Sequence, residues 1–317
     1  MKLPGWRVRG ITRNPSGASA KKYADQGAEL VKGDLDDEAS LARAFAGAHA
    51  IFSVTDFWQH FSNPANAEKA RNVGRTINEY AYDLEVAQGL RIARAAASAE
   101  VAATLERFVF SSLSEARRWS GGKYEALFHF DGKAEVVNRI RSAMPGLAAR
   151  MSCVQIGHYV TNWKGFDVMA PKRQPDGSYL VLKPEPAETQ VPFVCTQRDT
   201  GAFVKALVLD LPPGKTLLGV SEFMTWPEWM RLWGDHLGVK AGFAQVPMEE
   251  FLKNVPEALK AELSQSYQYA AEFGWDGGDP DVMRVEDVSD RPFKLSFTVT
   301  CLTECSKSSR STCHELR

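Results

Sequence analysis

The chain has 317 residues, of which 44% are apolar and 24% are charged, and its formal net charge is -1. This length allows one large domain or two modest ones with a buried core. A nearly neutral chain lacks the basic surface of most nucleic-acid binders, so we expect no direct nucleic-acid partner. No apolar run is long enough to span a membrane, and residues 1–6 lack the apolar core of a secretory signal. We therefore expect a cytoplasmic protein with no membrane partner.

The first half of the chain alternates strand and helix patterns, which is typical of a doubly wound parallel sheet. We expect strands at residues 6–12, 28–32, 50–54, 107–111 and 147–154. We expect helices at residues 18–26, 36–46 and 76–99, and around Lys133, Val136 and Ile140. The predicted fold class is therefore α/β, with residues 1–154 as a Rossmann-like part.

The pattern changes after residue 155. Asp176 and Gly177 lie between apolar stretches and predict a hairpin turn. Two further helical pieces are expected within residues 251–273. We predict a smaller mixed α/β lobe at residues 155–290, which would hold the substrate or a partner, followed by a disordered tail at residues 291–317. Cys301, Cys305 and Cys313 lie in this tail without a folded frame, so we expect no metal site.

A capping box predicts one helix of the second half especially clearly. Thr225 and Glu228 flank an early proline, and Gly238 would end the helix. Three tryptophans of this helix, Trp226, Trp229 and Trp233, share one face. Core packing explains such a face, and an apolar substrate cleft is the alternative.

Polar residues follow three of the predicted strands, namely Thr12-Arg13-Asn14, Gly33-Asp34 and Thr55-Asp56-Phe57. Ligands of a doubly wound sheet bind beyond the carboxyl ends of its strands. An arginine at such a position suits a 2′-phosphate, whereas an acidic residue would hold a ribose 2′-hydroxyl. Arg13 therefore favours NADP over NAD, with a solvated turn arginine as the alternative.

The most distinctive segment is F-H-F-D-G-K-A-E-V at residues 128–136. Together with residues 10–15, 33–34, 54–56 and 159–162, it resembles the NmrA-like family, whose members are atypical short-chain dehydrogenases. The resemblance extends from about residue 5 to residue 288. It implies an NAD(P)-binding fold, NADP as the cofactor and a small apolar substrate.

The resemblance also implies roles for individual residues. The 2′-phosphate segment corresponds to Arg13, Asn14, Pro15, Ser16 and Gly17, and the adenine contacts correspond to Asp34 and Leu35. The loop beside the ribose and pyrophosphate corresponds to Thr55, Asp56 and Phe57. Lys133 matches the lysine that reaches the nicotinamide ribose, and the loop near the nicotinamide corresponds to Tyr159, Val160, Thr161 and Asn162. We expect the Lys133 side chain to face the cleft and to matter more for cofactor binding than for the fold.

The sequence departs from the family in three places. The family's opening strand and glycine-rich loop would precede Met1, and a Ser/Thr/Cys-rich tail replaces the usual C-terminal helix, so we expect a truncated or misannotated reading frame that binds the cofactor poorly. The Y-x-x-x-K pattern of standard short-chain dehydrogenases is replaced by His129-x-x-x-Lys133. His129 is a candidate catalytic acid together with Lys133, and a histidine packed beside the cofactor is the alternative.

The leading hypothesis is an NADP-dependent oxidoreductase, with a role in fungal secondary-metabolite biosynthesis implied by the resemblance. The alternative is a non-catalytic NADP(H) sensor that binds a protein partner such as a transcription factor. The missing tyrosine favours this second class.

Overall fold

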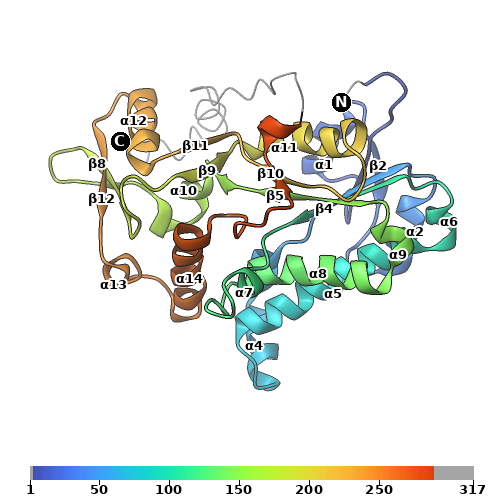
Figure 1. Cartoon of the computed structure of the whole chain (residues 1–317), viewed down its shortest axis with the longest axis horizontal. Coiled ribbons are helices and arrows are strands. Elements are labelled where there is room, and N and C mark those ends of the chain that lie inside the picture. Colours follow the sequence, from blue (N-terminus) through green and yellow to red (C-terminus); the bar gives the residue numbers. More distant parts are fainter. Residues whose placement is uncertain (1–2, 289–317) are drawn as a thin grey trace. The chain divides into compact units, whose positions relative to one another are not determined.

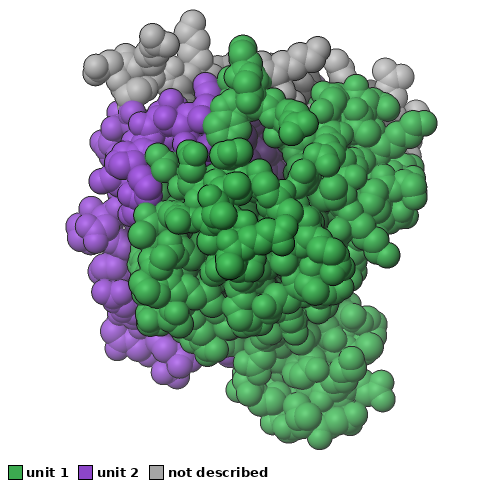
Figure 2. All heavy atoms as spheres, turned by 90° about the vertical axis from the view of Figure 1, so that its right-hand side faces the viewer, with its two compact units in different colours: residues 1–111, 132–152 green, residues 112–131, 153–317 purple. Residues whose placement is uncertain are grey.

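The structure is a computed structural model that describes residues 3–288, which form two compact units (Figure 2). Within the described residues, unit 1 contains residues 3–111 and 132–152, and unit 2 contains residues 112–131 and 153–288. The predicted functional division at residue 154 is a different boundary and remains a prediction.

Unit 1 is built from two pairs of parallel strands with helical connections. Strand β1 (Arg9–Thr12) pairs with β2 (Glu29–Lys32), and β3 (Ala50–Ser53) pairs with β4 (Arg107–Ser112). The helices are α1 (Ala18–Ala24), α2 (Glu38–Phe45), α3 (Phe57–Phe61), α4 (Pro64–Asn72), α5 (Ile77–Ala97), α6 (Ala99–Ala102) and α9 (Pro145–Ala148). Most of α8 (Phe128–Ala143) also belongs to this unit, from Gly132 onward.

The two long helices of unit 1, α5 and α8, lie side by side (Figure 1). Gly89 of α5 faces Val136 of α8, and a Cβ atom added at Gly89 would lie 2.5 Å from Val136 Cγ2. Both Val136 and the neighbouring Ile140 are fully buried. The glycine therefore permits the close approach of the two helices.

Unit 2 contains three small groups of strands. Strand β10 (Thr216–Gly219) lies between β5 (Met151–Ile156) and β13 (Val282–Met283), and all three are parallel. In the second group, β9 (Val191–Val194) pairs with β6 (His158–Tyr159) and β11 (Glu222–Met224). In the third, β8 (Tyr179–Lys183) pairs with β7 (Lys172–Arg173) and β12 (Ala241–Gln245).

The helices of unit 2 are α7 (Ala116–Trp119), α10 (Asn162–Gly165), α11 (Thr196–Lys205), α12 (Trp226–Leu237), α13 (Met248–Phe251) and α14 (Glu257–Phe273). Short 3-10 turns lie at Asp167–Met169 and Val285–Asp287, and a π-helical turn at Ala206–Asp210 extends α11. Helix α12 packs on β8 and β12 (Figure 1) and buries its tryptophan face.

Local sequence signals account for several of these elements. At α12, the Thr225 hydroxyl accepts from the Glu228 amide, the Glu228 carboxylate accepts from the Thr225 amide, and Gly238 ends the helix at a φ of 67°. The predicted hairpin is confirmed, since Gly177 has a φ of 82° between the antiparallel strands β7 and β8. Among the helices at residues 3–288, none has the length and apolarity needed to cross a membrane.

Two expectations about element ends are wrong. The strand expected from residue 147 begins only at Met151, because Pro145 starts the short helix α9. The helix expected from residue 36 begins only at Glu38, because Asp37 caps it by accepting from the Ser40 amide. The expected α/β class with parallel strands is confirmed, and the predicted tail at residues 291–317 lies outside the described residues.

The edges of β1 and β3 are open within residues 3–288. In this range β1 pairs only with β2, and β3 pairs only with β4. Three apolar side chains on or beside these strands are exposed, namely Ile11, Phe52 and Val54. Open edges present unpaired backbone groups that can pair with another chain.

Candidate functional site

Arg13 and Asp34 both lie just beyond the carboxyl ends of the paired strands β1 and β2. Thr12 lies opposite Lys32 in the register, and the Gly33 amide donates to the Thr12 carbonyl at 3.1 Å. The side chain of Arg13 is exposed, and within the described part of the chain it forms no ion pair. Arg13 is therefore a strand-end guanidinium without an ion-pair partner among residues 3–288.

The turn after Arg13 is held by its own hydrogen bonds. Asn14 Oδ1 accepts from the Ser16 hydroxyl at 2.9 Å, and the Gly17 amide donates to the Asn14 carbonyl at 3.2 Å. A Cβ atom at Gly17 would lie 3.2 Å from Asn14 Nδ2 and 3.3 Å from the Asn14 carbonyl oxygen, so the glycine packs closely against Asn14. Pro15 is half-buried within this turn.

Asp34 and Leu35 begin the connection from β2 to α2. The Asp34 amide donates to the Ser40 hydroxyl at 2.9 Å, and Asp34 Oδ1 accepts from the Asp36 amide at 3.1 Å. Asp34 and Leu35 are both half-buried. The hydrogen bonds fix the backbone here, directly after the strand end.

Residues 55–57 have three different environments. Thr55 is buried, whereas Asp56 is exposed and caps α3 by accepting from the amides of Trp58 and Gln59. Phe57 is 1% exposed and lies in the core. Of the three side chains, only that of Asp56 therefore faces the surface.

Lys133 is bound within unit 1 by residues of two other elements. Its Nζ donates to the Thr55 carbonyl at 2.8 Å and to Thr55 Oγ1 at 3.2 Å, and it forms an ion pair with Glu85 of α5. The Thr55 hydroxyl also donates to Glu85 Oε1, at 2.8 Å. The side chains of Lys133 and Glu85 are 12% and 0% exposed. The other carboxylate oxygen, Glu85 Oε2, is buried and has no hydrogen-bond partner among the described residues.

The expectation that Lys133 matters more for cofactor binding than for the fold stays a prediction, and the structure adds an ion pair with Glu85. A buried carboxylate requires a nearby positive charge, so Lys133 is a member of a structural ion pair at the end of β3. Sequence analysis missed Glu85. A sequence signal was present, because Glu85 lies on the same helix face as the apolar residues Ala81, Gly89 and Ile92.

His129 is oriented within unit 2 by a glutamate of α14. Its Nδ1 lies 2.5 Å from Glu262 Oε1, and its backbone amide donates to the same oxygen at 3.0 Å. Glu262 is 0% exposed and the His129 side chain is 14% exposed. A carboxylate bound to one imidazole nitrogen fixes the ring orientation, as in the histidine–carboxylate pairs of many enzymes. Glu262 was also missed by sequence analysis.

The segment expected near the nicotinamide continues from β6 to α10. Tyr159 is 44% exposed, whereas Val160 points into the core and its amide donates to the Val194 carbonyl at 3.1 Å. Thr161 and Asn162 are half-buried at the start of α10. Unit 2 therefore holds His129 and this segment, and unit 1 holds the other candidate residues.

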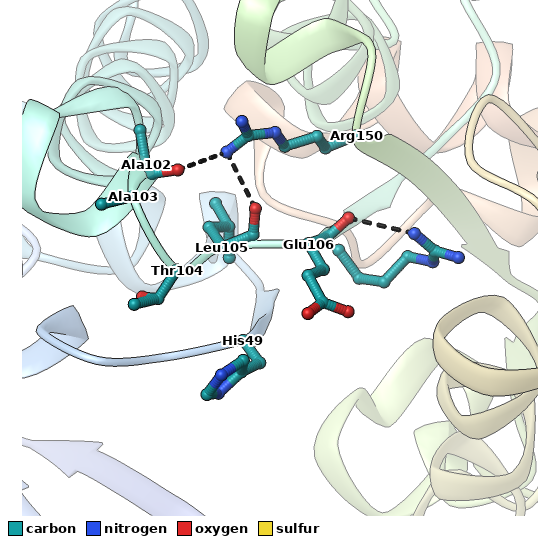
Figure 3. A pocket seen from close by; sticks show the side chains of 8 residues that line it. His49, Ala102, Ala103, Thr104, Leu105, Glu106 and Arg150 are labelled. Atoms are coloured by element: carbon teal, nitrogen blue, oxygen red, sulfur yellow. Dashed lines mark hydrogen bonds between the residues drawn. The ribbon is translucent and has the colours of Figure 1, made fainter.

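One hollow of unit 1 lies away from these residues, at the amino ends of its strands. It has a volume of about 530 Å³, and its walls include His49, Thr104, Glu106 and Arg150. Figure 3 shows the Arg150 guanidinium bound to the carbonyls of Ala102 and Leu105, at 2.7 and 2.8 Å. Because ligands of parallel α/β sheets bind at the opposite, carboxyl ends, we do not assign the site to this hollow.

The family model of the NmrA-like family matches residues 1–299. The chain belongs to the NmrA-like family. One relative is the NmrA-like family domain-containing oxidoreductase hkm9 of Aspergillus hancockii, which is 27% identical over 262 residues, covering 79% of this chain and 70% of hkm9. A second, oxidoreductase notA' of Aspergillus versicolor, is 40% identical over 63 residues, or 18% of each chain.

Solved structures share the fold of this family member. The negative transcriptional regulator NmrA in complex with NADP has a TM-score of 0.62 and 21% identity, covering 83% of this chain and 73% of NmrA. The triphenylmethane reductase of Citrobacter sp. complexed with NADP(H) has a TM-score of 0.61 and 18% identity, covering 96% and 92% of the two chains. The fold is thus Rossmann-like, with additional small sheets in the later part of the chain.

Proposed function

We propose that this NmrA-like protein is an NADP-dependent oxidoreductase that acts on a small apolar metabolite. The observation that carries the proposal is Arg13, an exposed cation at the end of β1 without an ion-pair partner in residues 3–288. No acidic residue occurs in the turn that follows, from Asn14 to Gly17. A guanidinium in this position suits a 2′-phosphate, which NADP carries and NAD lacks.

The other candidate residues of unit 1 fit the adenosine half of the same cofactor. Asp34 and Leu35 follow the neighbouring strand β2, whose last residue, Lys32, lies opposite Thr12 in the register. Lys133 donates to the Thr55 carbonyl and so holds the segment that follows β3. In this proposal Lys133 positions Thr55 and Asp56 for the ribose and pyrophosphate, and its ion pair with Glu85 holds the lysine side chain in place.

His129 is the proposed acid. NADP, when bound, supplies or accepts the hydride, and the protein must hold the proton that accompanies it. Glu262 binds Nδ1 of His129, so Nε2 is the nitrogen proposed to exchange this proton with the substrate. The names of the relatives support the reaction class, since hkm9 is called an oxidoreductase and the Citrobacter protein a reductase.

Calorimetric titration with NADPH and NADH tests the cofactor assignment. Loss of a charge-assisted hydrogen bond to phosphate should make Arg13→Ala bind NADPH about tenfold more weakly, or about 1.4 kcal/mol, with NADH affinity unchanged. Arg7→Ala is the matched control, because Arg7 is exposed but precedes β1 and so lies at the other end of the strand. Equal affinity of the wild type for both dinucleotides would contradict the proposal.

One observation favours the second function, an NADP(H) sensor. The pattern H-x-x-x-K lacks the tyrosine of standard short-chain dehydrogenases, and Lys133 is engaged by a buried carboxylate. The NmrA structure with NADP is that of a negative transcriptional regulator. Both functions require NADPH binding. They differ in whether NADPH absorbance at 340 nm falls when small apolar carbonyl compounds are added.

A further inference from the structure

The helix that carries His129 begins without a side-chain cap of its own. The first α-helical hydrogen bond of α8 runs from the Asp131 amide to the Leu127 carbonyl, at 2.9 Å, so Leu127 occupies the N-cap position. A leucine side chain has no atom that accepts a hydrogen bond, and Leu127 is fully buried. The backbone amides around the start of α8 therefore need acceptors from another part of the molecule.

Helix α14 supplies two such acceptors. Glu262 Oε1 accepts from the His129 amide at 3.0 Å, and Gln265 Oε1 accepts from the Ala126 amide at 2.7 Å. His129 is the second residue of α8, whose amide is one that an N-cap side chain ordinarily binds. The two acceptors are three residues apart and so are neighbours on the surface of α14, and the two amides are also three residues apart. The side chains of α14 thus cap α8 in place of Leu127.

The contact made by Glu262 restricts the position of His129. One oxygen, Glu262 Oε1, accepts from the His129 amide and also lies 2.5 Å from His129 Nδ1. A backbone amide and a ring nitrogen of the same residue can reach one oxygen only if the backbone stays in a narrow range of positions. The negative charge of Glu262 is also favourable at the amino end of a helix.

Gln265 fixes the backbone that leads into this contact. Its hydrogen bond holds Ala126 three residues before His129, and within residues 3–288 its side chain binds no other group. The side chain of Ala126 is a methyl group and cannot replace this bond. Gln265 is half-buried and uncharged, so it adds an acceptor without adding a second charge beside Glu262.

We propose that Gln265 is a positioning residue for His129, because its bond to Ala126 keeps the His129 amide and Nδ1 within reach of the same oxygen of Glu262. The inference rests on the proposed function, in which Nε2 of His129 exchanges the proton. A neutral histidine that donates from Nδ1 has an unprotonated Nε2, which is then the nitrogen that takes up and releases the proton. Gln265 acts through His129 and does not contact the reacting atoms.

The tautomer of His129 tests this inference. Long-range proton–nitrogen NMR spectra of the full chain, labelled with 15N-histidine at about pH 9, distinguish the Nδ1–H and Nε2–H forms of neutral imidazole, and His129→Gln identifies the signals of His129. In the wild type we expect Nδ1–H to exceed Nε2–H by at least about tenfold, since the bond to Glu262 is charge-assisted. Gln265→Met keeps the length of the side chain but removes the acceptor, and it should lower this ratio about tenfold.

Gln268→Met is the matched control. Gln268 lies on the same helix, is exposed, and forms no hydrogen bond within residues 3–288. This variant should retain the wild-type tautomer ratio. Gln265→Asn, whose amide is one methylene too short to reach Ala126, repeats the test should Gln265→Met not fold.

An Nε2–H form in the wild type, or a wild-type tautomer ratio in the folded Gln265 variants, would overturn the inference. A residue that only stabilised the fold would lower the midpoint of thermal unfolding without changing the tautomer of the folded protein. The spectra are recorded without dinucleotide or substrate. A failure of NADPH binding therefore contradicts the proposed function alone, whereas an unchanged tautomer contradicts this inference alone.

Discussion

At the scale of single residues, the ion pair between Lys133 and Glu85 determines what a mutation at Lys133 does. Lys133→Met leaves the carboxylate of Glu85 buried without a countercharge, since its Oε2 has no partner in the described part of the chain. Breaking a buried pair in this way costs about 3–5 kcal/mol. We expect urea denaturation to show a loss of this size.

A double variant separates this charge effect from the loss of packing. Adding Glu85→Gln to Lys133→Met removes the unpaired charge, so the double variant should be more stable than Lys133→Met alone. Lys69→Met, at an exposed position of α4, should change stability by no more than about 0.5 kcal/mol. A stability of Lys133→Met close to the wild type would support the expectation that Lys133 matters more for cofactor binding than for the fold.

At the scale of elements, the contact between α5 and α8 depends on Gly89. Alanine normally favours a helix over glycine by about 1 kcal/mol. Here its Cβ would lie 2.5 and 2.8 Å from the two methyl groups of Val136, and such overpacking costs about 1–3 kcal/mol. We therefore expect Gly89→Ala to lower the free energy of unfolding by about 1–2 kcal/mol in chemical denaturation.

A glycine-to-alanine substitution should instead raise the free energy of unfolding at a helix position where an added Cβ meets no other atom. Gly201, within α11, has no atom within 4 Å of an added Cβ, so Gly201→Ala should stabilise by up to about 1 kcal/mol. Adding Val136→Ala should restore part of what Gly89→Ala loses. A stabilising effect of Gly89→Ala would show that the helices shift apart without cost.

These elements also show how far the sequence alone could lead. Local signals predicted the parallel strands of unit 1, the hairpin at Gly177 and the capping box of α12, because each depends on residues close together in the chain. The expected start of β5 was wrong because the proline that opens α9 was not considered.

The candidate site was predictable only in part, for a physical reason. Arg13 and Asp34 follow strands directly, so their position could be expected. The partners of Lys133 and His129 could not be expected, because they are distant in the sequence. Glu85 lies 48 residues from Lys133, and Glu262 lies 133 residues from His129. No local periodicity encodes which buried carboxylate meets which cation.

At the scale of the whole molecule, the open edges of β1 and β3 should govern self-association. An open, apolar strand edge can pair with the edge of another copy. Phe52 lies on β3 and is 43% exposed, so its side chain contributes little to the core. Phe52→Lys places a charge on this edge, and we expect weaker self-association in sedimentation velocity over a range of concentrations, with stability changed by no more than about 0.5 kcal/mol.

Val73→Lys distinguishes association by strand pairing from nonspecific association through exposed apolar side chains. Val73 is even more exposed, at 62%, but it follows α4 and belongs to no strand edge. If association depends on backbone pairing at the edge, Val73→Lys should leave it nearly unchanged while Phe52→Lys reduces it. Equal reductions in the two variants would instead show that exposed apolar surface, wherever it lies, causes the association, because both substitutions replace an exposed apolar side chain with the same charge.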